Sequence, residues 1–275
     1  MHLVKSNIGI TGINSILCKH FVKNYSKKYN FIIYKGDINN IQYLKKWLLK
    51  NHIIKIFINF AALTSTKKCE LDKKLANETN YKSVIKISNL FQKNKLLNLT
   101  YFLALSSSHV FMPSNNKLKE TSKKNPINYY GMTKLNMEKS LLKEKKKFTV
   151  GIGRVFNYYN KSNKSGYFIN DVLLNLKSTK KIITFNGVDT IRDFTEITDI
   201  LSAINHMIVN KLSGDYNICS GKSFSLKKII KTINKNLKKE ILFNGKSQKG
   251  YVGDNTKLKK TGWLIKNPIK YNSFV

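Results

Sequence analysis

The sequence contains few cysteines, prolines and arginines. Its 275 residues include three cysteines and three prolines, and only two of the 50 basic residues are arginine, the other 48 being lysine. The cysteines, Cys18, Cys69 and Cys219, stand far apart, so they form neither a metal-binding spacing nor an even disulfide set. This excludes a disulfide scaffold and predicts a reduced, cytoplasmic protein with no bound metal.

Long apolar runs are also missing. The best candidate, residues 56–63, already contains Asn59 and is far shorter than the ~20 apolar residues that a membrane-spanning helix needs. The start, Met1–Gly12, lacks a basic segment followed by an apolar stretch and a cleavage site, so we expect neither secretion nor a membrane partner. With 41% hydrophobic and 24% charged residues, the composition indicates one large globular domain, or one with a smaller appendage.

Acidic residues are scarce, and 15 Asp and Glu against 50 basic residues give a net charge of +35. Such a charge favours nucleic acid or another polyanion as a partner. Nucleic-acid binders, however, depend on arginine and gather their charge on one face, whereas these lysines are spread from end to end. A surplus of Lys, Ile and Asn, with 33 asparagines, is typical of an adenine- and thymine-rich coding sequence. We therefore expect solvated lysines and no nucleic-acid partner, with polyanion binding as an alternative.

Strand and helix patterns alternate through the first half of the chain. This alternation predicts an α/β fold, a doubly wound parallel (Rossmann) sheet with helices on both faces. Beyond residue 154 the segments shorten, and Gly and Asn interrupt them more often. We predict a first domain over residues 1–153 and a smaller lobe over 154–275, with some segments returning to the first domain. Strands are predicted at 7–11, 31–34, 54–60, 100–105 and 149–153, and helices at 16–25, 41–49, 74–94 and 129–144.

The turn after the first strand is a candidate dinucleotide site. Such a turn needs small residues at three positions, for the turn itself, for approach to the pyrophosphate and for helix packing. Here Gly12 occupies the first position, and Ser15 and Cys18 replace the other two glycines. Ser15 could still offer its backbone N–H to a phosphate at the helix N-terminus. Taken alone, an ordinary strand–helix turn explains this segment better than a cofactor site does.

A tyrosine and a lysine four residues apart form the second candidate site. On a helix, Tyr130 and Lys134 project from the same face. A phenol titrates near ~10, and an ammonium ~4 Å away at an effective dielectric of ~20 contributes roughly 4 kcal/mol, or about three pKa units. The pair could therefore act as a general acid or base near neutral pH. It follows Pro126 and the strand that ends in Ser106-Ser107-Ser108.

Further motifs extend along nearly the whole chain. They are Gly36-Asp37-Ile38, Asn59-Phe60-Ala61-Ala62, Asn80, Ser106 to Phe111, Arg154-Val155-Phe156-Asn157, Arg192-Asp193-Phe194 with Asp199, Tyr216 to Gly221, and Asp254 to Trp263. Together with the turn and the Tyr–Lys pair, they resemble the extended short-chain dehydrogenase/reductases, also called the NAD-dependent epimerase/dehydratase family of nucleotide-sugar enzymes. The resemblance implies NAD or NADP as cofactor and a nucleoside-diphosphate sugar as substrate.

The resemblance also implies roles for individual residues. Those expected to be catalytic are Ser107, Tyr130 and Lys134, with Asn80 supporting them. Those expected at the substrate are Ser108, Asn157 and Arg192; both arginines fall on these motifs, and a guanidinium can bind a diphosphate with two parallel hydrogen bonds. The alternative for Arg192 is an ion pair with Asp193 or Glu196. Those expected at the cofactor are Gly12, Asn14, Ser15, Ile16, Asp37, Ile38, Phe60, Ala61 and Ala62, besides Tyr130 and Lys134.

Departures from the family pattern refine the expected reaction. The segment between Tyr34 and Gly36 is short and lacks an acidic residue for the adenine ribose, whereas Lys35 could meet a 2′-phosphate, which favours NADPH. Dehydratases that these motifs resemble carry an acidic residue just after the catalytic hydroxyl, where this chain has Ser108 and His109. We therefore expect a 4-ketoreductase or 4-epimerase. The degraded glycine turn leaves open a nucleotide-binding or regulatory module without turnover, and a homodimer is also open.

Overall fold

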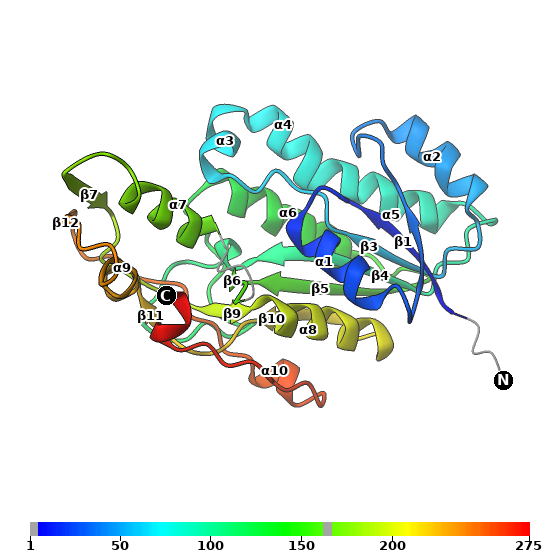
Figure 1. Cartoon of the computed structure of the whole chain (residues 1–275). Coiled ribbons are helices and arrows are strands. Elements are labelled where there is room, and N and C mark those ends of the chain that lie inside the picture. Colours follow the sequence, from blue (N-terminus) through cyan, green and yellow to red (C-terminus); the bar gives the residue numbers. More distant parts are fainter. Residues whose placement is uncertain (1–4, 162–166) are drawn as a thin grey trace. The chain divides into compact units, whose positions relative to one another are not determined.

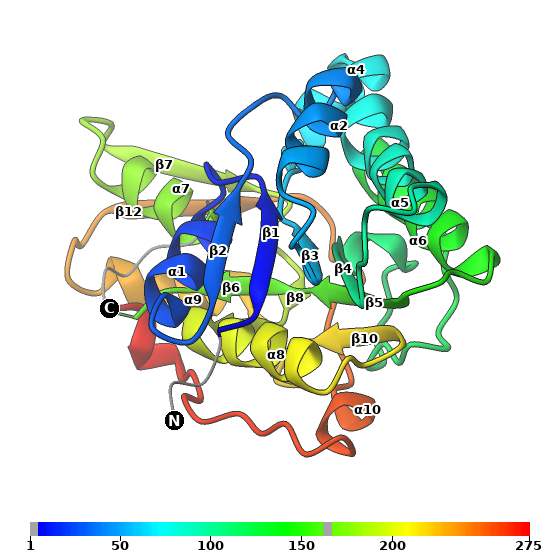
Figure 2. The same ribbon diagram turned by 90° about the vertical axis from the view of Figure 1, so that its right-hand side faces the viewer.

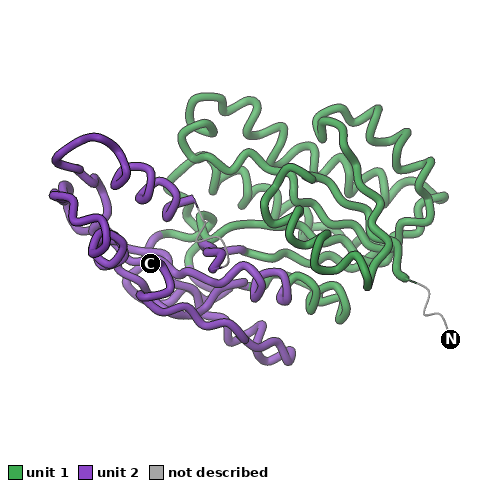
Figure 3. The backbone as a smooth tube through the Cα atoms, in the orientation of Figure 1, with its two compact units in different colours: residues 1–112, 123–154, 204–216 green, residues 113–122, 155–203, 217–275 purple. Residues whose placement is uncertain are grey.

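The structure is a computed structural model that describes residues 5–161 and 167–275. The first four residues of the segment Met1–Gly12, which was considered above for a secretion signal, lie outside the described residues. The chain forms two compact units (Figure 3). Unit 1 comprises residues 1–112, 123–154 and 204–216, and unit 2 comprises residues 113–122, 155–203 and 217–275. The chain passes from unit 1 to unit 2 after Arg154, next to the predicted boundary. It also enters unit 2 for residues 113–122 and returns to unit 1 for residues 204–216.

Unit 1 is built on a six-stranded sheet of order β10-β5-β4-β3-β1-β2. Strand β1, next to the edge strand β2, pairs in parallel with β2 and β3, and β3 pairs in parallel with β4. This arrangement confirms the predicted doubly wound fold. The strands are β1 (Asn7–Thr11), β2 (Asn30–Ile33), β3 (Ile56–Asn59), β4 (Tyr101–Ser107), β5 (Thr149–Val155) and β10 (Gly214–Ile218).

Helices cover both faces of this sheet. Figures 1 and 2 show α1 (Ile16–Tyr25) on one face, and α2 (Ile41–Lys50), α5 (Ser83–Lys93) and α6 (Tyr129–Lys143) on the other. On the α1 side, Asn205 of α8 (Ile197–Val209) accepts a hydrogen bond of 2.7 Å from the Tyr29 hydroxyl. The core beneath α2, α5 and α6 is aliphatic and aromatic, with Leu44, Leu48, Phe57, Ile87, Phe91, Phe102, Met137, Leu141 and Ile152 among its buried residues.

The predicted helix over residues 74–94 differs in detail. It consists of α4 (Lys73–Asn77), a π-helical turn η1 (Glu78–Lys82) and α5. A further helix, α3 (Thr66–Leu71), precedes it and was not predicted, because its six residues are too few to show an apolar period. Its ends are set by side chains: Ser65 accepts from the Lys68 N–H at 3.2 Å, and Asp72 begins α4 by accepting from the Leu75 N–H at 2.8 Å.

Unit 2 consists of short paired strands and helices around its own core. The pairs are β6 (Asn157–Tyr159) with β9 (Phe194–Glu196), β7 (Ile182–Asn186) with β12 (Glu240–Asn244), and β8 (Ile191–Arg192) with β11 (Phe224–Ser225). The helices are α7 (Tyr167–Leu176), the first half of α8, α9 (Leu226–Asn234), α10 (Thr256–Lys259) and the 3-10 turn η3 (Tyr271–Phe274). Within the described ranges, no helix of either unit is long and apolar enough to cross a membrane.

Candidate active site

The carboxyl end of β4 carries the predicted catalytic hydroxyl. Ser107 is the last residue of the strand, and its Oγ accepts a hydrogen bond of 3.3 Å from the His109 N–H, which begins the 3-10 turn η2 (Ser108–Val110). Because this bond uses a lone pair of the hydroxyl, the Ser107 proton is left to be donated elsewhere. Both Ser107 and Ser108 are buried, with 7% and 4% of their surface exposed.

Helix α6 begins close to this strand end. Asn128 is its N-cap, with extended backbone and a side-chain oxygen that accepts from the Gly131 N–H at 2.9 Å. Gly131 lies so close to η2 that a Cβ built on it would overlap the carbonyl oxygen of His109 and come within 2.9 Å of its carbonyl carbon. Only glycine permits this approach, so Gly131 and Asn128 together determine where the first turn of α6 lies against β4.

The predicted pair on α6 faces the end of β4. Lys134 is 2% exposed and its ammonium donates a hydrogen bond of 3.0 Å to the carbonyl oxygen of Leu105. The Tyr130 ring meets the ring of His109 edge to face, with centroids 5.7 Å apart. Leu105 and His109 lie two residues before and two after Ser107 in the sequence. Lys134 and Tyr130 therefore contact residues on either side of Ser107 in the sequence, and their joint action with Ser107 stays a prediction.

The buried ammonium of Lys134 has unusual electrostatics. Burial lowers its pKa from the ordinary value of 10.5 to about 8, and the negative charge of Glu138 and the Cys69 thiol oppose this shift. Lys134 therefore still carries its proton at neutral pH, at a position from which water is excluded. Removal of water strengthens the interaction of a charge with its neighbours. The predicted lowering of the Tyr130 pKa by this charge stays a prediction.

Asn80 supports the site from the π-helical turn rather than touching it. Its amide binds both backbone groups of Leu63, accepting from the N–H at 2.8 Å and donating to the carbonyl at 3.0 Å. The same amide donates to Thr133 Oγ1 at 3.2 Å, and that hydroxyl donates to the Tyr130 carbonyl at 2.7 Å. Asn80 is thus a positioning residue, fully buried, that ties the loop after β3 to the first turn of α6.

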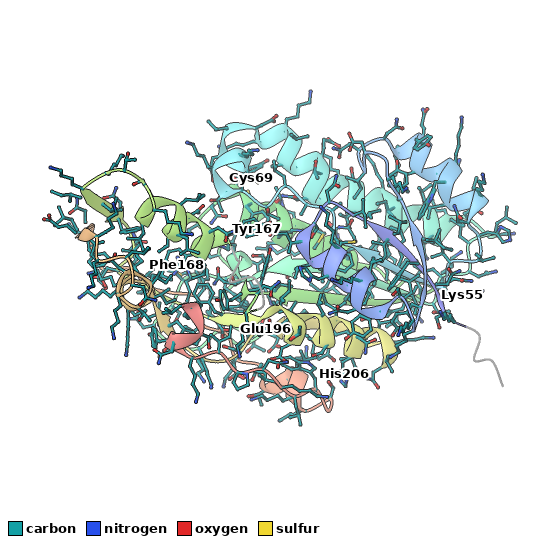
Figure 4. The ribbon with its side chains drawn as sticks, in the orientation of Figure 1. Lys55, Cys69, Tyr167, Phe168, Glu196 and His206 are labelled. Atoms are coloured by element: carbon teal, nitrogen blue, oxygen red, sulfur yellow. The ribbon has the colours of Figure 1, made fainter. Side chains whose placement is uncertain are left out.

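Cys69 is a neighbour of the site that the sequence did not indicate. It lies on α3 (Figure 4), packs in one apolar cluster with Tyr130, and donates through Sγ to the Leu63 carbonyl at 3.3 Å. Burial raises the pKa of this thiol, and the charge of Lys134 partly opposes the rise. The sequence did not indicate that Cys69 lies beside the site, because helix α3, which carries it, was not predicted.

At the turn after β1, the structure explains why the first glycine is kept. Gly12 has φ +80°, and a Cβ built on it would overlap the Ala61 N–H and lie 2.6 Å from the Phe60 carbonyl carbon. The turn and the end of β3 are also joined by a 2.6 Å hydrogen bond from Thr11 to Asn59. Gly12, Phe60 and Ala61, three of the predicted cofactor residues, therefore lie together, with Ala62 following half-buried.

The predicted contribution of Ser15 is wrong. Its backbone N–H donates to the Gly12 carbonyl at 2.9 Å within the turn, so this hydrogen is already used. The first bond of α1 runs from Lys19 to the Ser15 carbonyl, which leaves the N–H groups of Ile16, Leu17 and Cys18 without a helical acceptor. The Ser15 side chain caps none of them. Ile16, another predicted residue, thus lies where an anion could bind, and Asn14 is exposed in the turn.

Cys18 and the loop after β2 complete this part of unit 1. Cys18, in place of the third glycine, is fully buried, and burial raises its pKa to about 12, so it acts as a packing residue. Asp37 is exposed and accepts from the Asn39 N–H at 2.9 Å, while Ile38 is buried in the core. Lys35, on the same loop, is exposed.

In unit 2, the Arg192 guanidinium contacts neutral groups. Its Nη1 donates to Thr190 Oγ1 at 2.8 Å and to the Ile191 carbonyl at 3.0 Å, and its guanidinium lies 5.1 Å from the centroid of the Tyr251 ring. Across residues 5–161 and 167–275, no carboxylate forms an ion pair with it, contrary to the alternative of a pair with Asp193 or Glu196. Burial lowers its pKa, opposed by Tyr251. An uncompensated, half-buried guanidinium is a suitable group for binding an anion.

Asp193 holds the segments around Arg192 in place instead. Its carboxylate accepts from Ser220 and Gly221 N–H groups, both at 2.8 Å, and from the Ser220 hydroxyl at 2.7 Å. Burial raises its pKa to about 6, although these donors oppose the shift. The amide of Asn157 donates to the Asp193 carbonyl at 3.1 Å, so both predicted substrate residues of unit 2 are attached to this one acidic residue.

Arg154, the other arginine on a family motif, is not available to a substrate. Its guanidinium donates two hydrogen bonds to Glu138, of 2.9 and 2.7 Å, and pairs with Asp215 as well. It also lies 5.0 Å from the centroid of the Phe111 ring, and its side chain is 1% exposed. The two parallel hydrogen bonds that a guanidinium can form are made here to a carboxylate, inside unit 1.

Comparison with solved structures shows the same fold in several enzymes. The chain is 18% identical to RMD from Pseudomonas aeruginosa, complexed with NADPH (TM-score 0.82, covering 98% of this chain and 97% of that one). It is 22% identical to dTDP-4-dehydrorhamnose reductase from Bacillus anthracis in complex with NADP (0.80; 96% and 94%). It is 17% identical to UDP-glucose 4-epimerase from Thermotoga maritima with UDP-glucose (0.83; 98% and 96%).

A family model also matches almost the entire chain. The model is described as GDP-mannose 4,6 dehydratase and matches residues 11–266, from the turn after β1 to the segment beyond α10. The match includes the end of β4, the Tyr–Lys pair of α6 and the Arg192 segment of unit 2. The predicted resemblance to the nucleotide-sugar epimerases and dehydratases is thereby confirmed, and the chain belongs to the GDP-mannose 4,6 dehydratase family.

Proposed function

We propose that this protein is an NAD(P)-dependent oxidoreductase that reduces the C4 ketone of a nucleoside-diphosphate sugar, with 4-epimerisation as the related alternative. The observation that carries the proposal is the convergence of Ser107, Tyr130 and Lys134 at the end of β4. It combines a hydroxyl donor, a phenol and a buried cation at one place. These are the groups that a carbonyl needs when it accepts a hydride and then a proton.

Features of unit 1 fit a dinucleotide cofactor. A Cβ at Gly12 would fill the space between the turn and the end of β3, and three N–H groups at the start of α1 have no helical acceptor. Gly12, Ile16 and the Phe60-Ala61 segment would hold the pyrophosphate and its neighbouring groups. Asp37 and Ile38 would lie at the adenine and the exposed Lys35 at a 2′-phosphate, which favours NADPH. When bound, the nicotinamide supplies the hydride.

Residues of the chain itself bind the sugar and transfer the proton. Ser107 donates its free hydroxyl proton in a hydrogen bond to the C4 oxygen of the sugar, because its lone pair already accepts from His109. Tyr130 transfers its phenolic proton to that oxygen, or removes it in the reverse direction. Lys134 stabilises the resulting phenolate through its charge. Arg192 and Asn157 bind the diphosphate portion, so that binding energy remote from the reaction orients the ring.

The absence of an acid beside Ser107 separates this reaction from dehydration. Removal of water across two sugar carbons requires a general acid near the leaving hydroxyl. The two residues after Ser107 are Ser108 and His109. This chain therefore has a hydroxyl and an imidazole, and no carboxylate, directly after the proposed catalytic serine. We therefore favour a reductase or epimerase within a family whose model carries a dehydratase description.

The buried lysine leads to an expected pH dependence. The pKa of Lys134 is lowered to about 8, so its proton is retained below this value and lost as the pH rises through it. Since the proposed mechanism needs the charged form, kcat/KM should decline above about pH 8, whereas an ordinary lysine would hold it constant to about pH 10. A profile of kcat/KM from pH 6 to 10 measures this. A flat profile up to pH 9.5 would contradict the role of the charge.

The function is tested with a panel of nucleotide-linked 4-keto sugars and both reduced coenzymes. We expect a loss of absorbance at 340 nm with at least one sugar, faster with NADPH than with NADH. Coenzyme titration separates the alternative of a non-catalytic module: dissociation constants in the micromolar range support an enzyme. No binding at millimolar coenzyme, or binding without turnover of any sugar in the panel or of the corresponding 4-hydroxy sugars, would reject the proposal.

A further inference from the structure

His109 connects the two proposed catalytic groups of unit 1 through three separate contacts. Its backbone N–H donates to Ser107 Oγ at 3.3 Å, and its ring packs edge to face on Tyr130. Its Nδ1 lies 2.9 Å from the side-chain nitrogen of Asn128, the N-cap of α6. One residue thus contacts the hydroxyl at the end of β4, the phenol on α6 and the residue that begins α6.

The hydrogen bonds of Asn128 determine the protonation state of the imidazole. Its Oδ1 accepts from the Gly131 N–H at 2.9 Å, so this atom must be the oxygen and the other must be the NH2 group. The NH2 group donates, and His109 Nδ1 at 2.9 Å therefore has to accept. An accepting Nδ1 carries no proton, which places the ring proton on Nε2 and makes the imidazole neutral.

We propose that His109 is a positioning residue for the reaction, which sets the spacing between the Ser107 hydroxyl and the Tyr130 phenol by accepting the hydrogen bond of Asn128. This inference rests on the proposed function, because it gives His109 a task only if Ser107 and Tyr130 act on one carbonyl. The contact holds the cap of α6 against η2, where Gly131 already permits close approach.

Protonation of His109 would remove this arrangement. A second ring proton would set an N–H against the NH2 group of Asn128, so two donors would face each other and the bond would be lost. The start of α6 would then move away from η2, and Tyr130 with it. A displacement of about 1 Å in a catalytic group can cost about 100-fold in rate. Activity should therefore fall on acidification as the His109 ring takes up its second proton.

Other ionisable groups lie near the contact between His109 and Asn128, and their protonation could also affect the start of α6. From α6, Tyr130 meets the ring directly and Lys134 lies one turn further on. From α3, Glu70 accepts from the Tyr129 N–H at 2.7 Å, next to Asn128. Beyond Phe111, at the end of η2, lies the Arg154 pair with Glu138. Because Glu70 contacts the backbone of α6 and not the imidazole, its effect is separate from the His109–Asn128 contact.

Two substitutions distinguish the hydrogen bond from mere packing. In His109→Asn, the side-chain oxygen can replace Nδ1 as an acceptor and does not titrate. In His109→Leu, bulk is kept and the acceptor is lost. We expect His109→Leu to lower kcat by about 10- to 100-fold with coenzyme affinity unchanged. We expect His109→Asn to retain kcat within about threefold at pH 7.5 and to lose the decline between pH 7 and 5.5.

A matched control is available on α8. His206 (Figure 4) lies 3.3 Å through Nδ1 from the side-chain nitrogen of Asn210, a similar contact outside the site. His206→Asn should leave both kcat and the acidic decline unchanged. If the decline persists in His109→Asn, or if His109→Leu matches the wild type in kcat, the positioning role is wrong.

A measurement without turnover separates this inference from the proposed function. Long-range ¹H–¹⁵N NMR at pH 7.5 should show His109 as the neutral tautomer protonated on Nε2. A signal of the Nδ1–H tautomer or of an imidazolium would overturn the inference even in an active enzyme. The expected tautomer in a protein that turns over no sugar would instead reject the proposed function and leave the Asn128 contact standing. The same spectrum also decides the case if His109→Leu does not fold.

Discussion

Replacing Tyr130 by phenylalanine should lower kcat by about 10²- to 10⁴-fold, the usual contribution of a general acid or base. The substitution removes one oxygen and keeps the ring, which packs against His109 and in the cluster around Cys69. Folding and coenzyme binding should therefore remain close to those of the wild type. Since the Lys134 ammonium donates to the Leu105 carbonyl, its position should be unchanged as well.

The matched control is Tyr129→Phe, one residue earlier on α6. Tyr129 is half-buried and its ring lies 5.6 Å from the ammonium of Lys73, so it shares the helix without facing η2 in any contact described above. Initial rates with saturating coenzyme and sugar, together with coenzyme titrations, measure both variants. If Tyr130→Phe keeps more than a tenth of the wild-type kcat while Tyr129→Phe behaves the same, the phenol is not the proton donor.

Replacing Arg154 by methionine should produce the largest loss of stability. The substitution leaves the Glu138 carboxylate, whose side chain is 3% exposed, without the partner that donates two hydrogen bonds to it. Removal of one member of a buried ion pair typically costs about 3–5 kcal/mol, because the remaining charge is uncompensated. Asp215 suffers less, since it is 21% exposed and has Lys124 at 3.9 Å as a second partner.

A double substitution tests this cause. Replacing Arg154 and Glu138 together by methionine removes both charges, and apolar replacement of a buried pair is often close to neutral. We expect the double variant to recover at least half of the loss seen in Arg154→Met. Urea denaturation of the three proteins gives the free energies of unfolding. A loss below about 1 kcal/mol in Arg154→Met, or a double variant less stable than the single one, would show that the pair contributes little.

The sequence predicted the elements of the first sheet more accurately than the segments that connect them. The strand at residues 7–11 and the helix at residues 16–25 have the predicted bounds, because short apolar runs and helical periodicity are local signals. The short helix α3 and the π-helical turn at Asn80 were missed, because side-chain caps and packing determine them, not periodicity. These two elements position Cys69 and Asn80 beside α6.

The two arginines illustrate why a motif does not determine a partner. Both fall on the family's motifs in a chain otherwise rich in lysine, but only Arg192 was expected to bind a diphosphate. Arg154 is instead used inside unit 1, because the folding of α6 brings Glu138 within 2.7 Å of it, 16 residues away in sequence. The neighbouring Asp193 is instead occupied by the backbone N–H groups of Ser220 and Gly221, and no ion pair joins it to Arg192 in the described part of the chain.

By itself, the sequence determined the parallel α/β architecture and the helical spacing that places Tyr130 and Lys134 on one face, since both follow from the repeat of neighbouring residues. Only the tertiary structure decided which atoms those side chains meet. The bond from Lys134 to Leu105 and the contact of His109 with Asn128 join segments 29 and 19 residues apart. Such contacts depend on how closely two packed elements approach, which at Gly131 is controlled by the absence of a single Cβ.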